Sequence, residues 1–493
     1  MGKKRAIILF ISLGIVLYAL IFLFSIEKIQ DKKEHLLIKD IGHLYPTYVK
    51  KIVKENQTEQ LKELLADARE KRLNVSIAGS QHSQGGHTYY KDALVINMKD
   101  YDNVLNLDLQ NKIITVQSGA TWDDVQNYIN PYNLSVKVMQ SSNIFTIGGT
   151  MSANAHGRDL DRTAMIDTVK SFRLLLANGT MVNVNRTENS ELFNLAIGGY
   201  GMFGVILDAD IQLTNNEIYK TSTKSVNYKE FPNYFADHIK NNESVALMLV
   251  RPSIDPDSLF EDLTIFTWGK TNQLLDSKLI QLTKEEHVIR DKFLFGLSRK
   301  YDWGKKLRWY LQKKIESGEN RLISRNNAMR PPEAPIELLE HNSESDTDIL
   351  QEYFIPTRNF VNFSDEFIHI LKEDNVNVLS FTIRYVAPNN ESFLSYSPNE
   401  ESFAIIYYGN VKLREKDLKK TEKTIQKIVD LAIKNNGTYY LTYNLYPTQE
   451  QIRKAYPNID FVFSKKKEYD SKQMFMNKFY AKYALGEEDE RYW

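Results

Sequence analysis

Cysteine is absent from the 493 residues of this chain. Its absence excludes disulfides, thiolate metal ligands, a thiol nucleophile and any cofactor bonded to cysteine. Neither sign of charge predominates, because Lys plus Arg and Asp plus Glu number 63 each. The chain therefore lacks the overall basic field typical of nucleic-acid binding, and we expect no nucleic-acid partner.

Several short motifs of established chemistry are missing as well. No G-x-G-x-x-G stands between a strand and a helix, and no P-loop lysine motif is present, so nicotinamide-binding and P-loop folds are not expected. No G-x-S-x-G elbow supports a serine triad. The nine histidines show no H-E-x-x-H or comparable spacing, so we expect no metal site.

The N-terminus carries no charged residue between positions 6 and 26. As a helix rising about 1.5 Å per residue, this segment can cross the roughly 30 Å hydrocarbon core of a bilayer. Lys3, Lys4 and Arg5 precede it, so the positive-inside rule places the N-terminus in the cytoplasm and the remaining chain outside. No clear small-x-small exit precedes Glu27, which favours a membrane anchor over the alternative, a cleaved signal peptide. We expect a single-pass protein of the cell membrane with extracytoplasmic domains.

After a charged linker, short helices alternate with short strands. Residues 61–68 carry apolar side chains at i, i+3, i+4 and i+7, which is typical of an amphipathic helix. Thr121 and Asp124 resemble a pair that caps the start of a second helix. Residues 171–184 read as two strands around Asn178-Gly179, which predicts a hairpin with a type I′ turn. The pattern indicates an α+β domain, and a change of composition near residue 218 indicates a second one.

Glycine is concentrated in three segments of the first domain: VSIAGSQHSQGG from Val75, IGGTMSANAHGRD from Ile147 and GGYGMFGVI from Gly198. In the first, a strand runs into a turn at Gly79 that presents His82, and the unpaired N–H groups of such a turn can cradle a phosphate. Three such clusters suit a dinucleotide that lies against protein backbone. The alternative is that these glycines only mark turns.

Taken together, these segments resemble the FAD-linked oxidoreductases of the vanillyl-alcohol oxidase type, nearest their sugar-lactone and alditol oxidase branch. The resemblance implies an α+β fold: a two-subdomain FAD-binding domain of the PCMH type at 42–217, an α+β cap (substrate) domain at 218–430, and a C-terminal segment at 431–493 packing where they meet. In this chain an N-terminal transmembrane helix, 6–26 within the anchor and linker 1–41, precedes them.

The same resemblance assigns the cofactor residues. In the family, the loop after the first strand binds the FAD pyrophosphate, and its histidine is often bonded covalently to the flavin; here that histidine is His82. The second glycine segment is expected along the flavin and the third near the adenine. The expected FAD-binding residues are Gly79, Ser80, Gln81, His82, Ser83, Ile147, Gly148, Gly149, His156, Gly157, Gly201, Gly204, Val205 and Ile206.

On the substrate side the likeness is partial. LQEYFIP at Leu350–Pro356 resembles a strand of the family's cap domain, and Arg384 stands at the arginine of the family's E-x-R strand, with Thr382 in place of the glutamate. Where the family has H-W-G-K, this chain has Tyr440 to Tyr443. We expect Arg384 to orient the substrate or stabilise charge, and Tyr440 and Tyr443 to handle protons.

Gln140 aligns with the position whose size influences whether oxygen reaches the flavin, and Ser141 lies beside it in the expected substrate pocket. A large side chain there favours a dehydrogenase over an oxidase. We therefore expect a membrane-anchored FAD-dependent oxidoreductase that oxidises a CH–OH group of a sugar-derived lactone, polyol or related compound by hydride transfer to flavin N5. The electron acceptor stays open. The alternatives are an enzyme with noncovalent flavin acting on a lipid-linked sugar, and an inactive sugar-binding module on the same fold.

The basic and aromatic run at 293–309 leaves two interpretations open. It fits an ordinary helix of the second domain with Leu307, Leu311 and Ile315 in the core, which is the favoured interpretation. The alternative is contact with an anionic membrane surface.

Overall fold

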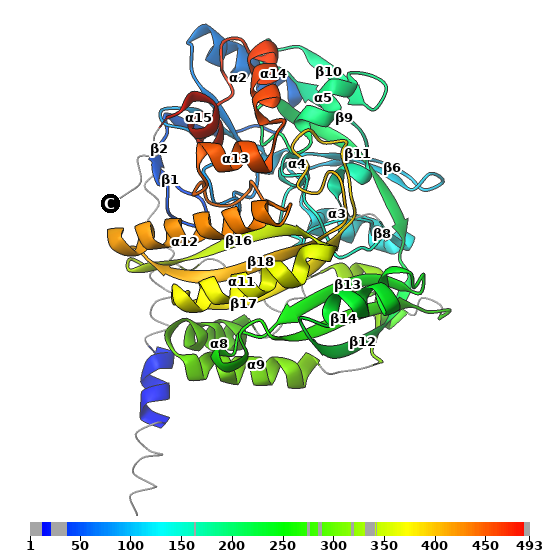
Figure 1. Ribbon diagram of the computed structural model, residues 1–493. Helices are drawn as coiled ribbons and strands as arrows, with labels where there is room; N and C mark the ends of the chain where they lie inside the picture. Colours follow the sequence, from blue (N-terminus) through cyan, green and yellow to red (C-terminus); the bar gives the residue numbers. More distant parts are fainter. Residues whose placement is uncertain are drawn as a thin grey trace, which may run out of the picture.

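The computed structural model of this chain describes residues 12–20, 37–161, 164–273, 277–283, 288–316, 320–330, 341 and 343–487. Figure 1 shows three smaller sheets in the upper half of the molecule and an eight-stranded sheet in the lower half. The predicted membrane span at 6–26 lies largely outside these residues. Its described part, 12–20, is helical. In the part of the chain that the structure describes, no helix is long and apolar enough to cross a bilayer.

The first glycine loop follows a small parallel sheet. Its strands lie in the order β3 (Lys51–Lys54), β5 (Leu94–Asn97) and β4 (Val75–Ala78), and α2 (Thr58–Glu70) connects β3 to β4. The predicted apolar stripe of α2 is confirmed, because three of its four positions, Leu61, Leu65 and Ala68, are fully buried in the core that this helix shares with the sheet. A separate antiparallel pair is formed by β1 (Leu37–Ile38) and β2 (Thr47–Tyr48).

The second sheet is antiparallel and provides the scaffold for the other two glycine segments. Thr121 forms the predicted cap at the start of helix α3. The Thr121 hydroxyl accepts from the Asp124 N–H at 3.2 Å, and the Thr121 N–H donates to the Asp124 carboxylate at 2.8 Å. The strands, in spatial order, are β10 (Met181–Asn185), β9 (Val169–Leu175), β11 (Val205–Asn215), β7 (Ile113–Gln117) and β6 (Val104–Asp108), with β8 (Leu134–Val136) also on β11; the helices are α3 (Trp122–Ile129), α4 (Ile147–Ser152) and α5 (Ser190–Ala196).

The hairpin between β9 and β10 forms as predicted, but its turn differs. Leu176 pairs with Thr180, and the Gly179 N–H donates to the Leu176 carbonyl at 2.9 Å, so the loop holds three residues instead of two. Gly179 has a φ of 87°, whereas Asn178 does not have a positive φ. The predicted type I′ turn is wrong: this is the three-residue loop in which a left-handed glycine follows a type I turn.

The eight-stranded sheet is antiparallel and lies across the middle of the molecule. Helices α11 (Phe360–Glu373) and α12 (Glu415–Lys434) pack against it, and α8 (Val288–Lys300) contacts β17. Its strands, in spatial order, are β15 (Leu322–Ser324), β12 (Ile218–Asn227), β14 (Asp262–Lys270), β13 (Val245–Pro252), β17 (Val378–Val386), β18 (Ser402–Lys412), β16 (Asp346–Pro356) and β19 (Thr438–Tyr439).

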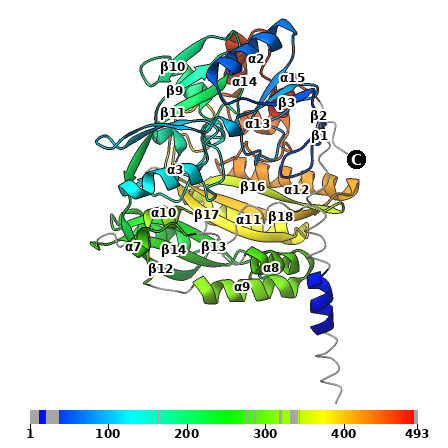
Figure 2. The same cartoon turned by 180° about the vertical axis from the view of Figure 1, so that it is seen from behind.

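Helices α8 and α9 (Asp302–Glu316) form a hairpin at the lower end of the molecule, and helix 12–20 lies beside α8 in both views (Figures 1 and 2). The favoured burial pattern of α9 is wrong at Leu307, which is 38% exposed. Leu311 instead lines a cavity, and the Ile315 side chain lies outside the described part of the chain. The hairpin therefore has one face toward the sheet and an apolar outer face.

The remaining helices are short. The C-terminal ones return to the first sheet, where the Val75 N–H donates to the Met474 carbonyl at 2.7 Å and the Met476 N–H to the Val75 carbonyl at 2.8 Å. The remaining helices are α6 (Phe231–Phe235), α7 (Ser277–Ile280), α10 (Arg325–Met329) and, near the C-terminus, α13 (Gln449–Ala455), α14 (Ile459–Tyr469) and α15 (Lys478–Leu485). Short 3-10 turns lie at Met98–Asp100, Asn130–Tyr132, Met165–Asp167, Pro256–Ser258 and Thr357–Asn359, and a π turn lies at Ala236–Lys240.

Candidate functional site

A cavity of about 530 Å³ lies where the three-stranded and six-stranded sheets meet the eight-stranded sheet. It brings together residues of the three glycine segments, of β16 and β17, and of the loop after β19. The predicted site residues that line it are Gly79, Ser80, Gln81, His82, Ser83, Gln140, Ser141, Gly148, Gly149, His156, Gly201, Gly204, Ile206, Arg384, Tyr440 and Tyr443.

Three predicted residues do not line the cavity. Ile147 and Val205 are fully buried in the core, at the starts of α4 and β11. Gly157 lies against backbone, because a Cβ there would come within 2.6 Å of the Met139 carbonyl oxygen. These three residues lie behind the residues that line the cavity.

The loop after β4 depends on a glycine at its first position. A Cβ on Gly79 would lie 2.1 Å from the Thr146 hydroxyl oxygen, so no larger residue fits without displacement. The next residue, Ser80, donates to the Ile144 carbonyl at 2.8 Å, and Gln81 has a φ of 57°. The loop is therefore held against the segment that leads into α4, and both segments face the cavity.

His82 lies deep in this loop, with its ring centroid 4.9 Å from that of Phe145. Burial lowers the pKa of His82 to about 4, and the positive charge of Lys99 acts in the same direction. Nδ1 is buried and has no hydrogen-bond partner. The imidazole is therefore neutral near pH 7, with ring nitrogen free to bond to a ligand.

The polar atoms around the cradle test whether a large polar ligand fits. In the described part of the chain, six of the buried hydrogen-bonding atoms without a protein partner belong to residues that line this side of the cavity. Leaving each one unpaired costs about 1–3 kcal/mol, so their concentration indicates a ligand that pairs with them. They include Gln81 Nε2, His82 Nδ1, Ser83 Oγ, Thr88 Oγ1, Ser118 Oγ and Ser142 Oγ. The set fits a bound dinucleotide.

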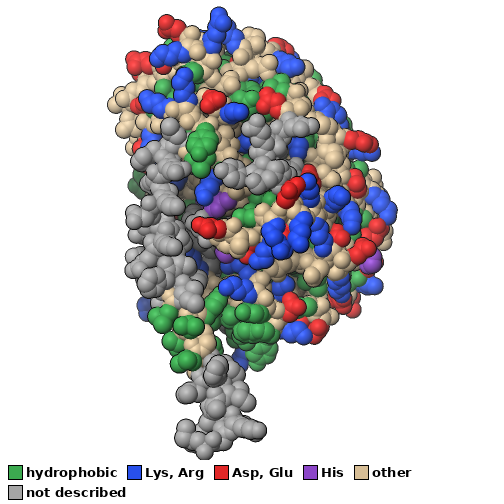
Figure 3. Space-filling view, turned by 90° about the vertical axis from the view of Figure 1, so that its left-hand side faces the viewer, with side chains coloured by type: hydrophobic (Ala, Val, Ile, Leu, Met, Phe, Trp, Pro, Cys, Tyr) green, Lys and Arg blue, Asp and Glu red, His purple; other side chains and the backbone are tan. Residues whose placement is uncertain are grey.

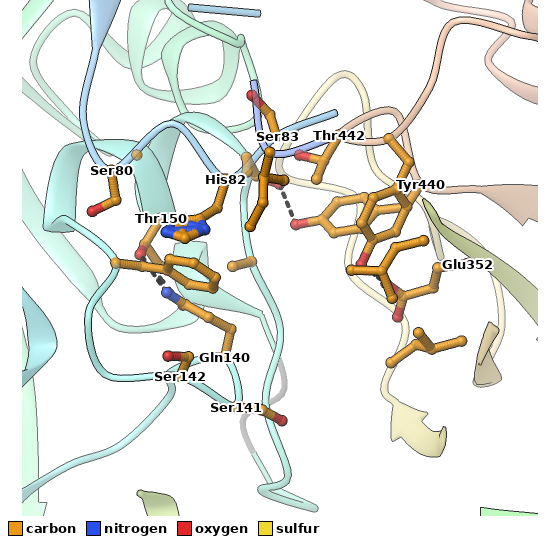
Figure 4. Close-up of a pocket in the computed structure, with 18 of the residues that line it drawn as sticks. Ser80, His82, Ser83, Gln140, Ser141, Ser142, Thr150, Glu352, Tyr440 and Thr442 are labelled. Carbon is orange, nitrogen blue, oxygen red and sulfur yellow. Dashed lines mark hydrogen bonds between the residues drawn. The ribbon is translucent and has the colours of Figure 1, made fainter. Parts of the chain in front are cut away.

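Gln140 is fixed on the same wall by Thr150. Its Nε2 donates to the Thr150 hydroxyl oxygen at 3.1 Å, and the Trp122 indole N–H donates to the same oxygen at 3.0 Å. Figure 4 shows His82, Thr150 and Gln140 on one side of the pocket, with Tyr440 and Glu352 on the other. The Gln140 amide thus has a defined position beside His82.

Arg384, on β17, reaches from the eight-stranded sheet to the glycine segments. It donates to the Ser141 hydroxyl at 2.6 Å and to the His156 carbonyl at 3.3 Å. Thr382, in the place of the family's glutamate, accepts a hydrogen bond from Arg251 of β13. Arg384 is therefore the charged side chain that this strand presents to the cavity, with no acidic residue two positions before it.

Glu352, on β16, lies at the centre of the opposite wall. Its carboxylate is 2.6 Å from His156 Nε2 and accepts from the Tyr443 hydroxyl at 3.2 Å. Sequence reasoning assigned it no role, although it lies inside the LQEYFIP segment that carried the resemblance. The segment that holds Glu352 could therefore be recognised in the sequence. Its pairing with His156 could not, because the two residues are 196 positions apart.

The two tyrosines of the segment after β19 lie beside Glu352, Tyr440 buried and Tyr443 half-buried. Burial raises the pKa of both Tyr440 and Tyr443 well above the ordinary value, and the Glu352 carboxylate adds to the increase. Tyr440 donates to the Ala153 carbonyl at 2.9 Å. Both hydroxyls are therefore protonated hydrogen-bond donors near pH 7.

Comparison with known proteins agrees with this geometry. A family model described as an FAD binding domain matches residues 49–185. The chain is 25% identical over 206 residues to L-gulonolactone oxidase of Bos taurus, covering 42% of this chain and 47% of that protein. It is 30% identical over 160 residues to the mitochondrial L-galactono-1,4-lactone dehydrogenase of Arabidopsis thaliana, covering 32% and 26%.

A third relative is decaprenylphosphoryl-beta-D-ribose oxidase of Mycolicibacterium smegmatis, 28% identical over 152 residues, which cover 30% of this chain and 33% of that protein. The chain thus spans less than half the length of each of these relatives. The predicted resemblance to the lactone-oxidase branch and the prediction of FAD as cofactor are confirmed.

Proposed function

Since residues 49–185 belong to the FAD-binding domain family and the relatives include lactone-oxidising enzymes, we propose that this chain is a membrane-anchored FAD-dependent oxidoreductase acting on a CH–OH group of a sugar-derived substrate. One observation carries the proposal: eleven of the fourteen residues predicted for FAD and all five predicted for the substrate line a single cavity. When bound, FAD supplies the hydride acceptor at its N5 atom.

In this proposal, the domain at 42–217 holds the cofactor, the domain at 218–430 covers it as a cap, and the segment 431–493 packs where they meet. The loop Gly79–Ser83 holds the FAD pyrophosphate, with His82 as the covalent tether. Its support is the buried, neutral imidazole with an unpaired Nδ1.

The proton of the substrate hydroxyl goes to the His156–Glu352 pair. A carboxylate only accepts hydrogen bonds, so the short contact places the imidazole proton on Nε2, facing Glu352. The lone pair is then on Nδ1, which is buried without a partner. Glu352 stabilises the imidazolium that forms when Nδ1 takes the proton, an arrangement that suits general-base catalysis.

Other residues hold the substrate. Arg384 orients it from β17 and balances negative charge that develops at the reacting group. Tyr440 and Tyr443 keep their hydroxyl protons, because burial raises the pKa of both. Those protons go to the Ala153 carbonyl and the Glu352 carboxylate, so the two hydroxyl oxygens are left to accept hydrogen bonds from the substrate. Gln140 limits the access of oxygen, so the enzyme acts as a dehydrogenase and passes its electrons to an acceptor other than oxygen.

The membrane anchor is part of the same proposal. Its support is the uncharged stretch at 6–26 and the exposure of apolar side chains in its described part, such as Leu13 at 68% and Leu17 at 61%. We place the FAD and cap domains outside the cytoplasm. Protease added to intact cells should degrade them, and full protection would contradict this orientation.

The function is tested in two stages with the purified full-length chain. The protein should be yellow and retain FAD; a colourless protein that takes up no FAD would instead support the sugar-binding module. Anaerobic addition of polyols, sugar lactones and lipid-linked sugars to the yellow protein should then identify a compound that bleaches the flavin. If no compound in these classes bleaches it, the proposed substrate class is wrong.

A further inference from the structure

The outer surface of the α8–α9 hairpin carries a row of exposed apolar and aromatic side chains. Trp303, Leu307 and Tyr310 of α9 are 55%, 38% and 58% exposed, and their spacing places them on one side of the helix. Tyr301, just before α9, is 48% exposed and stacks on Trp303 with ring centroids 5.6 Å apart. We call these four residues the hairpin face.

The composition of the hairpin face suits the boundary between water and lipid. Tryptophan and tyrosine combine an apolar ring with one polar atom and are enriched at the level of lipid headgroups. Lys306 and Lys313 follow Trp303 and Tyr310 by three positions, so their exposed side chains border the face. Lysine can cover apolar surface with its stem and keep its ammonium among the headgroups. Such a face with a lysine border is typical of a helix that lies in the interface of a bilayer.

The hairpin face lies at the end of the molecule where the N-terminal segment emerges. Figure 3 shows apolar side chains gathered at this end, and Figures 1 and 2 both place helix 12–20 beside the hairpin. In that helix, Leu13 and Leu17 are 68% and 61% exposed. Two exposed apolar surfaces from distant parts of the sequence therefore lie at one end of the molecule.

Tyr18 joins the N-terminal helix to α8. Its ring packs against Phe293 with ring centroids 5.8 Å apart, and Lys300 Nζ lies 5.0 Å from the centroid of the same ring. Gly296 allows this approach, because a Cβ there would lie 2.7 Å from the Tyr18 hydroxyl oxygen. The N-terminal helix thus packs on the hairpin through a defined contact.

The position of Tyr18 along the proposed membrane span sets the depth of α8. Tyr18 lies eight residues before Ile26, the last residue of the uncharged stretch. At about 1.5 Å per residue, a helix that spans the bilayer with residues 6–26 carries Tyr18 about 12 Å inward from the outer end of the span. Because α8 contacts Tyr18, the hairpin enters the outer leaflet with it. An exposed apolar face on the adjoining helix α9 is what such entry requires.

We propose that the α8–α9 hairpin enters the outer leaflet of the membrane and that the hairpin face contacts lipid directly. Acyl chains cover Leu307, and the aromatic rings lie at the level of the headgroups. This inference rests on the proposed function, because it starts from the anchor at 6–26. It deepens that function, since the cap domain binds the bilayer with its own surface and is oriented by two contacts instead of one.

Single-cysteine labelling of the full-length protein in phosphatidylcholine vesicles tests the proposal. The chain has no cysteine, so Leu307→Cys or Tyr310→Cys introduces the only thiol. A nitrobenzoxadiazole label at either position should emit at shorter wavelength and lose at least about half of its fluorescence to doxyl-labelled lipid, because an interfacial helix is buried about 5–10 Å. Met181→Cys is the matched control. Met181 is also 38% exposed and lies on β10, at the other end of the molecule (Figure 1), so its label should not be quenched.

A negative charge on the hairpin face provides the second test. In the Leu307→Cys protein, Tyr310→Glu should reduce quenching to the level of the Met181 label, because a carboxylate is unfavourable among acyl chains. Tyr132→Glu, at a tyrosine that is 49% exposed in the FAD-binding half, should leave the quenching unchanged. Both tyrosines are on the surface, so both variants should fold and keep their FAD. Unchanged quenching in Tyr310→Glu would overturn the proposal.

A label at Leu13→Cys separates this inference from the anchor on which it rests. If this label is quenched while those at positions 307 and 310 match Met181, the anchor stands and only the hairpin contact is refuted. If the label at position 13 is not quenched, the anchor of the proposed function is wrong and the inference fails with it. Emission at shorter wavelength without quenching at positions 307 and 310 would mean that protein, such as a second copy of this chain, covers the face, which also overturns the proposal.

Discussion

His156 Nε2 and Glu352 Oε1 lie 2.6 Å apart, with both side chains 2% exposed. The pair joins the second glycine segment to β16 of the eight-stranded sheet, and Arg384 donates to the backbone of the same histidine. A buried carboxylate so placed accepts the imidazole N–H and thereby fixes the tautomer of the ring. The proposed acid–base chemistry thus rests on one residue of a loop and one residue of β16.

Replacement of Glu352 by Gln tests the pair. The amide keeps the volume but loses the charge that stabilises the imidazolium, so anaerobic flavin reduction should slow by about 10²–10⁴-fold. FAD content should stay unchanged. Stopped-flow absorbance with the sugar found in the bleaching screen measures the rate. Glu391, in a surface ion pair with Arg186, provides the matched control: Glu391→Gln should not change the rate of flavin reduction. An unchanged rate in Glu352→Gln would exclude the pair from the proton transfer.

His82→Ala should convert a tethered flavin into a released one. Acid precipitation of the wild type should leave flavin in the protein pellet, because a covalent bond survives unfolding. The variant should release its flavin into the supernatant, as measured by absorbance. His87→Ala, a cavity histidine outside the loop Gly79–Ser83, should keep the covalent flavin. Release from the wild type as well would show that His82 is not a tether.

Gln140→Ala should increase the production of hydrogen peroxide several-fold. The wild-type amide is held by Thr150 at 3.1 Å beside His82, and its removal opens that wall of the cavity to oxygen. Peroxide is measured with a peroxidase-coupled dye during turnover. Gln449→Ala, on the surface, serves as the control. Vigorous peroxide production by the wild type would contradict the assignment as a dehydrogenase.

Stability should decrease as the pH falls from about 6 to about 4. Burial lowers the pKa of His43, His82 and His87 to about 4, below the value of about 6.5 for an unfolded histidine. The unfolded chain therefore binds three more protons in this window. Asp40 acts in the opposite direction, because burial raises its pKa to about 6 and the folded protein takes up that proton.

The unfolded chain thus binds two more protons than the folded chain, three on the histidines less one on Asp40. The free energy of unfolding should therefore fall by up to about 3 kcal/mol for each unit by which the pH is lowered. Urea midpoints between pH 4 and 7 measure the slope. His43→Asn should reduce the slope by one proton, while His369→Asn, whose side chain is 78% exposed, should not change it. A flat profile in the wild type would show that these histidines are not buried as the structure has them.

Much of the cofactor side could be predicted because its signals are local. A strand, a turn at Gly79 and a histidine three residues later lie within one short segment, and the glycine is required by contact with Thr146. The amphipathic helix α2 and the cap of α3 follow from spacing alone. The turn of the β9–β10 hairpin could not be predicted, since the strand register added one residue to the loop.

The sequence by itself determined that the chain has an FAD-binding domain and predicted which loop would face the cofactor, because contiguous residues carry both signals. Only the tertiary structure decided which residues from distant parts of the chain line the cavity together. Glu352 reaches His156 across 196 positions, and Arg384 of β17 reaches the Ser141 hydroxyl and the His156 carbonyl of the FAD-binding half of the chain. Strand order is set by packing over the whole chain, so no local pattern contains it.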